Sequence, residues 1–345
     1  MTASPTDVAD PKAPTAGPGS GQGPWYARQW GRKTPGDWLA AYGAVFVLVV
    51  MVIVFSILIP DTYPTWRNAK AILTSESTVL MVSLGLLVPA VVGEFDLSVG
   101  AMVAFAAIEM ALLSASMPWP VALGLTLASA VLIGLVSGLL VVKVGVNSFI
   151  ATLGMSTLLG GGSLWISGGA AVTEDIPESV TNLGQSELFG LPLPIVYVAV
   201  LAVILWYGFN HMPIGRKLYA TGGNRVAAEL SGVRTKRIVI SAFVVSAAVA
   251  ALAGIVIMMQ SGAGNPSVGP ELLLPAFAAV FLGSTTIIPG RFNVVGTVVG
   301  ILLLAVGVSG LQQLGAEYYV VPLFNGGVLL VAVAVSRLLA KERNA

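Results

Sequence analysis

The 345-residue sequence contains no cysteine and a single histidine, His211. The lack of cysteine excludes disulfides and thiolate chemistry, and a lone histidine excludes a metal site built from several His and Cys ligands. The sequence also lacks a G-x-x-x-x-G-K-[ST] phosphate loop, a nucleophile elbow, a zinc-binding helix motif and a dinucleotide fingerprint. We therefore expect no catalytic, cofactor-binding or metal-ligating residues, and any ATP hydrolysis has to come from another polypeptide.

Charge is also scarce, because charged residues make up only 10% of the chain, whereas soluble domains carry about 25%. Uncharged runs cover residues 39–59, 238–270 and 292–316, and about 20 apolar residues cross a bilayer as a helix. The predicted fold is all-α, a polytopic helical membrane protein. Ten spans are expected near residues 39–59, 75–92, 100–116, 119–142, 148–168, 193–210, 238–260, 272–288, 293–313 and 318–336.

The positions of lysine and arginine predict the orientation of these spans. With the N-terminus in the cytoplasm, 15 of the 17 basic residues fall in cytoplasmic segments, and only Arg67 and Lys70 fall outside. The predicted outer loop 169–192 contains acids and no base. Because cytoplasmic loops carry an excess of basic residues, we expect both termini in the cytoplasm and a multi-pass protein of the bacterial inner membrane.

The ends of the chain differ from its centre in composition. Residues 1–36 begin with a Pro- and Gly-rich stretch that cannot bury a core, which predicts a disordered cytoplasmic tail. Within that tail, "WYARQWGRK" (25–33) favours an anchor at the lipid interface over nucleic-acid binding. Residues 37–338 form the predicted transmembrane domain, with a cytoplasmic loop at 211–237, and residues 339–345 form a short cytoplasmic tail.

The stretch "GEFDLSVG" (93–100) places two carboxylates, Glu94 and Asp96, between apolar runs. Its glycines and Ser98 favour a helix break, where Asp96 or Ser98 would cap the next helix close to the inner membrane surface. A purely structural cap and a role in the solute pathway or its gate both remain open.

Further polar residues lie within or beside the predicted spans. Glu109 lies midway along the third span, and an acid inside a membrane is a functional hypothesis by default. Gln260, Gln312 and Asn325 are amides suited either to contacts between helices or to a hydroxyl-rich solute. A weak similarity between segments 95–106 and 292–303 leaves an internal repeat open.

The loop 211–237 contains six bases and one acid. Within it, "NRVAAELSGV" (224–233) starts with Asn and ends near Gly, which predicts a short helix with Val226, Ala227, Leu230 and Val233 on one side. Such an amphipathic helix can lie on the lipid surface or dock into a groove of a partner.

Four segments together resemble the permease subunits of bacterial sugar ABC importers of the ribose, xylose and arabinose type. They are "GEFDLSVGAMVA" (93–104), "GVNSFIATLGMSTLLGGGSLWISGG" (145–169), "GRKLYATGGNRVAAELSGV" (215–233) and "LGSTTIIPGRFNVVGTVVGILLL" (282–304). The sequence departs from the family pattern at Glu94, at Phe95, at Asn147 with Ser148, at Pro289 and at Phe292. These departures put in doubt that the solute is ribose or another common pentose.

The resemblance implies a permease that pairs with a second permease copy, two ABC ATPase subunits carrying ATP and Mg²⁺, and an extracytoplasmic solute-binding protein. It places ATPase docking on Gly222, Gly223, Asn224, Ala227, Ala228, Leu230, Ser231 and Gly232. The candidates for the pathway or its gate are Glu94, Asp96, Ser98, Glu109, Asn147, Phe149, Gln260, Gln312 and Asn325. The implied function is translocation of a small hydroxylated solute, such as a monosaccharide or polyol.

Three alternatives stay open at this point. A branched-chain amino-acid permease shares the superfamily and the ten-span arrangement. A proton-coupled secondary transporter would use Glu94, Asp96 and Glu109 as a relay, and a passive channel would need no partner. The sequence does not identify the solute, or say whether the permease dimer is homomeric or heteromeric.

Overall fold

The computed structural model describes residues 35–344, with side chains described between residues 41 and 336. Contacts divide the chain into Met1–Trp38 and Leu39–Ala345, and the description below concerns the second unit. The predicted tail and its "WYARQWGRK" segment lie largely outside the described residues. Pro35 and Gly36, which we assigned to the disordered tail, instead begin a helix. The last helix continues through residues 339–344, so the C-terminal tail is helical up to Asn344.

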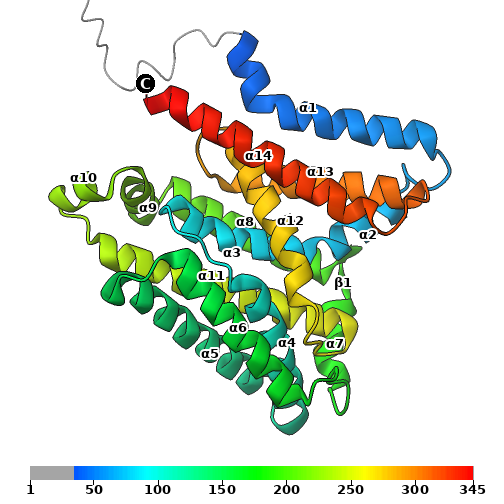
Figure 1. Ribbon diagram of the computed structural model, residues 1–345. Coiled ribbons are helices and arrows are strands. Elements are labelled where there is room, and N and C mark those ends of the chain that lie inside the picture. Colours follow the sequence, from blue (N-terminus) through cyan, green and yellow to red (C-terminus); the bar gives the residue numbers. More distant parts are fainter. Residues whose placement is uncertain (1–34, 345) are drawn as a thin grey trace, which may run out of the picture. The chain divides into compact units, whose positions relative to one another are not determined.

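The described part of the chain is built almost entirely from helices (Figure 1). These are α1 (Pro35–Leu58), α2 (Trp66–Ser75), α3 (Ser77–Val91), α4 (Val99–Ser116), α5 (Trp119–Leu139), α6 (Ser148–Ser167), α7 (Glu178–Gln185), α8 (Leu193–Asn210), α9 (Pro213–Gly223), α10 (Arg225–Leu230), α11 (Thr235–Ser261), α12 (Gly269–Ser284), α13 (Val294–Gln313) and α14 (Val320–Asn344). A π-helical turn, η2 (Leu140–Val144), extends α5, and strands β1 (Glu187–Leu188) and β2 (Leu191–Pro192) form an antiparallel hairpin. The all-α fold class is confirmed.

Seven of the described helices are long and apolar enough to cross a membrane. The bent pair α2 and α3, with a 45° angle between its helices, counts as an eighth span if it crosses as one unit. Helices α12 and the apolar part of α14 are shorter. Each of the ten predicted spans overlaps one of these helices, but the count of ten crossings and the orientation of the termini stay predictions.

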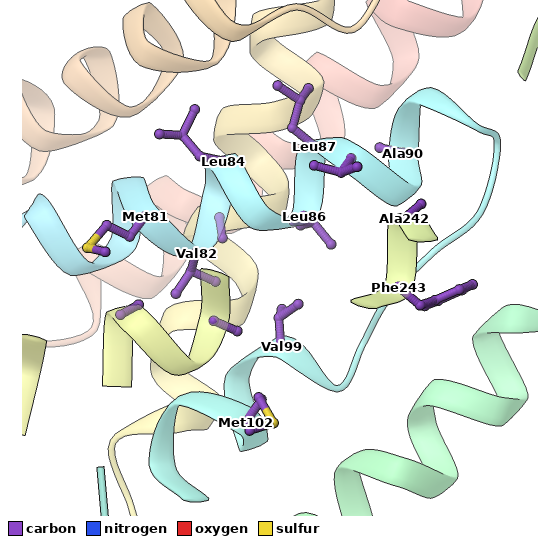
Figure 2. Close-up of a cluster of buried hydrophobic side chains, with 14 of the residues drawn as sticks. Met81, Val82, Leu84, Leu86, Leu87, Ala90, Val99, Met102, Ala242 and Phe243 are labelled. Carbon is purple, nitrogen blue, oxygen red and sulfur yellow. The ribbon is translucent and has the colours of Figure 1, made fainter. Parts of the chain in front are cut away.

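Helix α11 is the central element of the core, packing against α3, α4 and α5. Figure 2 shows this core, where Leu86 of α3, Met102 of α4 and Phe243 of α11 are fully buried. Small residues let the backbones approach closely: a Cβ added to Gly254 of α11 would lie 2.2 Å from the carbonyl oxygen of Val103. In lipid, where burial of apolar area does not drive association, such close packing holds helices together.

The two segments of the suspected repeat occupy comparable places, because α4 and α13 each follow an irregular loop. Their helix starts differ in detail. The side chain of Asn293 caps α13 by accepting a hydrogen bond from Gly296 N, whereas Ser98, at the same place before α4, makes no side-chain cap bond. The repeat stays a prediction.

Candidate functional site

The first part of the candidate site is the irregular chain between α3 and α4, which we call the break segment (residues 92–98) and which Figure 2 shows between Ala90 and Val99. The predicted helix break is confirmed here. The N–H of Phe95 donates to Ser148 Oγ at 3.3 Å, and the N–H of Leu97 donates to Thr152 Oγ1 at 3.0 Å. Non-helical backbone survives at membrane depth only when protein groups or a water-filled cavity satisfy it. The hydroxyls of α6 therefore hold this segment in place.

Asp96 is the most deeply buried acid of this segment, with 2% of its surface exposed. Its carboxylate accepts hydrogen bonds from Ser98 N at 3.0 Å, Ser98 Oγ at 2.6 Å and Ser246 Oγ at 2.7 Å. Asp96 accepts from Ser98 N, which precedes the first helical residue Val99, and Ser98 makes no side-chain cap bond, so the expected cap of α4 by either side chain is wrong. Ser246 lies near the middle of α11. The hydroxyl donors make burial of this carboxylate tolerable, and its expected position close to the inner membrane surface stays a prediction.

Glu94 lies at the other side of the break segment and contacts a different element. Its Oε1 forms an ion pair with the guanidinium of Arg225 at 2.7 Å. The Glu94 side chain is 12% exposed and the Arg225 side chain 46% exposed. Sequence reasoning assigned the acid to the solute pathway and the base to the docking loop, and did not foresee that they pair.

The second part of the candidate site is the helix pair α9–α10, in which a single residue, Asn224, separates the two helices (Figure 1). Its side chain accepts a hydrogen bond from Ala227 N at 3.0 Å, and Gly232 adopts a φ of 84° just after α10. The predicted short helix with an Asn start and a Gly end is confirmed. Its apolar pair is open to the surroundings, since Val226 is 67% and Leu230 86% exposed.

The α9–α10 pair packs closely against the end of α3. A Cβ added to Gly222 would lie 1.9 Å from the carbonyl oxygen of Val91, so only glycine fits this approach. Ala228 is 4% exposed, so its side chain is buried against the rest of the protein. Buried Ala228 and closely packed Gly222 therefore hold the α9–α10 pair against the rest of the protein.

A further contact joins α9 to the loop between α12 and α13. The hydroxyl of Tyr219 donates to the carbonyl oxygen of Phe292 at 2.7 Å. The Arg291 guanidinium lies 3.5 Å from the centre of the Tyr219 ring, a cation–π contact. Burial raises the pKa of the Tyr219 phenol, and the nearby charge of Arg291 acts in the opposite direction.

An aromatic cluster connects the two loops. Phe95 of the break segment lies against Phe277 and Phe281 of α12, with ring centres 6.5 and 6.4 Å apart, and Phe281 contacts Phe292 edge-on at 5.6 Å. Sequence reasoning noted Phe95 and Phe292 only as departures from the family pattern. The sequence signal that could have revealed the other rings of the cluster is the four-residue spacing of Phe277 and Phe281, which places both on one face of a helix.

The remaining pathway candidates are scattered. Glu109 of α4 accepts a hydrogen bond from Ser129 Oγ of α5 at 2.6 Å. Asn147 caps α6 by accepting from the N–H of Phe149 at 2.9 Å, and the Phe149 ring is 51% exposed. The structure thus gives Asn147 a local structural bond and leaves Glu109 joining two helices.

The three amides lie apart from the break segment. Gln260 donates to Ser77 Oγ at 3.3 Å, between α11 and α3. Gln312 lines a cavity of about 220 Å³ beside Glu76, and the buried Oδ1 of Asn325 has no hydrogen-bond partner within the described residues. Among the described residues, no three His, Asp or Glu side chains gather into a group that could hold a metal ion.

A comparison with sequence models of protein families identifies the family of this chain. The sequence model of the family described as "Branched-chain amino acid transport system / permease component" matches residues 68–333, which include the break segment, α9 and α10. The chain belongs to this family. It is therefore a transport permease component and a multi-pass membrane protein. No solved structure matches it.

Several curated relatives are similar to the permease over nearly its whole length. The ribose import permease protein RbsC of Haemophilus influenzae is 30% identical, covering 89% of this chain and 96% of the relative. The D-allose transport system permease protein AlsC of Escherichia coli is 31% identical, covering 87% and 92%. The autoinducer 2 import system permease protein LsrD of Photorhabdus temperata is 29% identical, covering 88% and 93%.

Proposed function

We propose that this permease is the membrane subunit of an ABC importer for a small hydroxylated solute, such as a monosaccharide or a related polyol. The relatives named for ribose, D-allose and autoinducer 2 carry this proposal, because each matches the permease almost from end to end. They favour the sugar assignment over the branched-chain amino-acid alternative, although the family description itself uses the latter name.

The ATPase subunits would dock on α10. The supporting observation is the exposed pair Val226 and Leu230, which lie four residues apart on a helix that Asn224 caps at its start. Exposed apolar side chains on one face of a short helix are the kind of surface that binds in a hydrophobic groove of a partner. Of the docking residues implied by the family resemblance, Gly222 and Ala228 hold α10 against the permease, so contact with the partner falls to Leu230 and its exposed neighbours.

The orientation follows from the same loop. Basic residues are concentrated in α9, α10 and the start of α11, and the positive-inside rule predicts that this loop is cytoplasmic. Ten crossings of the inner membrane, with both termini inside, then put the hairpin β1–β2 on the outer side, where a solute-binding protein would deliver the solute. A second permease copy would complete the pathway.

No covalent bond of the solute changes in this mechanism. ATP and Mg²⁺ would bind to the partner subunits, and ATP binding and hydrolysis would shift the permease between outward-open and inward-open states. A partner can drive such a shift only by binding the two states with different affinity. The α9–α10 pair, which contacts both the break segment and the loop before α13, is placed to transmit that difference.

The docking assignment is tested by Leu230→Glu, with Met212→Glu as a matched control in the same loop but outside α10. We expect Leu230→Glu to abolish copurification of the ATPase and uptake of radiolabelled D-ribose or D-allose, whichever the wild type carries, and Met212→Glu to retain both. Equal ATPase copurification from wild type and Leu230→Glu would refute docking on α10. Uptake by the purified permease alone, driven by a pH gradient or running downhill, would favour a secondary transporter or a channel instead.

A further inference from the structure

The ion pair between Glu94 and Arg225 joins two segments that are far apart in the sequence. Glu94 belongs to the break segment inside the membrane domain, and Arg225 is the first residue of α10. The hydrogen bond from Ala227 N to the Asn224 side chain fixes the first turn of α10, so the Arg225 side chain projects from an ordered backbone. A displacement of α10 is therefore carried directly to Glu94.

Glu94 is set deeper than its partner. Its side chain is 12% exposed, against 46% for Arg225. Ion pairs between fully exposed side chains contribute little because water screens them, but a partly buried acid that loses its only ion-pair partner is left poorly solvated. The pair is thus asymmetric, with the buried member on the permease side and the exposed member on the docking side.

Beyond Glu94 the chain gives little freedom to move independently. The next residue, Phe95, is held through its N–H by Ser148 and through its ring by Phe277 and Phe281. The residue after Phe95, Asp96, is hydrogen-bonded to Ser246 of the central helix α11. A pull on Glu94 would therefore shift the start of α4 and the aromatic cluster together.

The other end of that aromatic cluster is also attached to the helix pair. Phe292 contacts Phe281, and its carbonyl oxygen accepts the hydrogen bond from Tyr219 of α9. Helices α9 and α10 thus hold the break segment at one end and the loop before α13 at the other. Glu94, Phe95 and Phe292 are also three of the positions where the sequence departs from the family pattern.

We propose that Glu94 is a positioning residue whose ion pair with Arg225 couples movement of α10 to the break segment and the aromatic cluster. This inference rests on the proposed function, since it takes α10 as the helix that the ATPase moves. Glu94 touches no solute in this scheme. Without the pair, α10 would move on its partner while the break segment stays behind, so ATP would be hydrolysed with less solute transported.

The test uses the complete importer reconstituted in proteoliposomes, with solute transport and ATP hydrolysis measured on the same samples. The variants are Glu94→Gln, Arg225→Gln and the charge exchange Glu94→Arg with Arg225→Glu. We expect both single variants to keep membrane insertion and ATPase association but to transport at least about fivefold less solute per ATP. The charge exchange should recover most of that ratio. Lys143→Gln, which removes an exposed charge in η2, outside α9 and α10, is the matched control and should leave the ratio unchanged.

Three outcomes would overturn the proposal: an unchanged ratio in the single variants, a charge exchange no better than the single variants, or an equal loss in Lys143→Gln. Loss of ATPase association in Glu94→Gln would also overturn it, because the pair would then serve docking. These outcomes differ from failure of the proposed function, in which the wild-type permease itself would bind no ATPase.

Discussion

Replacing Asp96 tests how a membrane protein tolerates a buried carboxylate that is held by hydroxyl groups. Asp96→Ala removes the acceptor of three hydrogen bonds, from Ser98 N, Ser98 Oγ and Ser246 Oγ. Each buried donor left without a partner costs about 1–3 kcal/mol. The Ser98 hydroxyl can turn toward other acceptors, so we expect a net loss of about 3 kcal/mol in the free energy of unfolding.

Asp96→Asn separates the charge from the hydrogen bonds. The amide oxygen can still accept from Ser98 N, and the amide nitrogen can donate to Ser246 Oγ, because a hydroxyl both donates and accepts. Charge-assisted bonds are lost, but so is the cost of keeping an ionised group out of water. These two changes oppose each other, and we expect the stability of Asp96→Asn to lie within about 1 kcal/mol of the wild type.

The measurement is equilibrium unfolding of the purified permease in mixed detergent micelles with increasing SDS, followed by tryptophan fluorescence. Ser246→Ala, which removes one of the three donors, serves as the matched variant and should cost about 1 kcal/mol. If Asp96→Ala unfolded at the same SDS fraction as the wild type, the hydrogen-bond reasoning would be refuted. If Asp96→Asn folded normally but failed to transport solute, the charge itself would be required for function.

Two further predictions concern close packing and the intramembrane acid. Gly254→Val should sharply lower the yield of folded permease, because the new Cβ would lie 2.2 Å from a backbone oxygen and overpacking costs about 1–3 kcal/mol or more. Gly154→Ala is the control and should keep the wild-type yield, since its Cβ would meet nothing within 4 Å. Equal yields of the two variants in fluorescence-detected size-exclusion chromatography would contradict the packing argument. Glu109→Gln keeps an acceptor for the Ser129 hydroxyl and removes the titratable proton. Because the proposed importer is driven by ATP and not by protons, solute uptake by this variant should keep its rate between roughly pH 5.5 and 8. Loss of uptake together with loss of its dependence on a pH gradient would instead indicate proton coupling.

Helix positions were predictable because their signals are local. An uncharged run of about 20 residues identifies a helix in lipid without reference to any other segment. The helix α10 was equally predictable, since Asn224 and Gly232 form its two ends by local bonding and backbone geometry. The short elements α2, α7, α9 and the hairpin β1–β2 were missed. The helices among them have only 10, 8 and 11 residues, and a segment that is both short and partly polar gives a weak signal in a search for long apolar runs.

The functional pairings could not be predicted in the same way. Glu94 and Arg225 are 131 positions apart, and Asp96 and Ser246 are 150 apart. The sequence offers many acids, bases and serines as partners, and nothing in their spacing selects one pair. Asp96 shows the consequence: sequence reasoning expected it to cap α4, whereas packing of the break segment against α6 and α11 buries its carboxylate against Ser246.

By itself, then, the sequence determined that this chain is a helical membrane protein, and where its long apolar helices and the short helix α10 lie. The physical reason is that apolar length and helix capping act over a few neighbouring residues. Only the tertiary structure decided that the two acids of "GEFDLSVG" have separate roles, one tied to α10 and one to the middle of α11. Those roles depend on how backbones approach at positions such as Gly222 and Gly254, and such contacts form only when the helices pack.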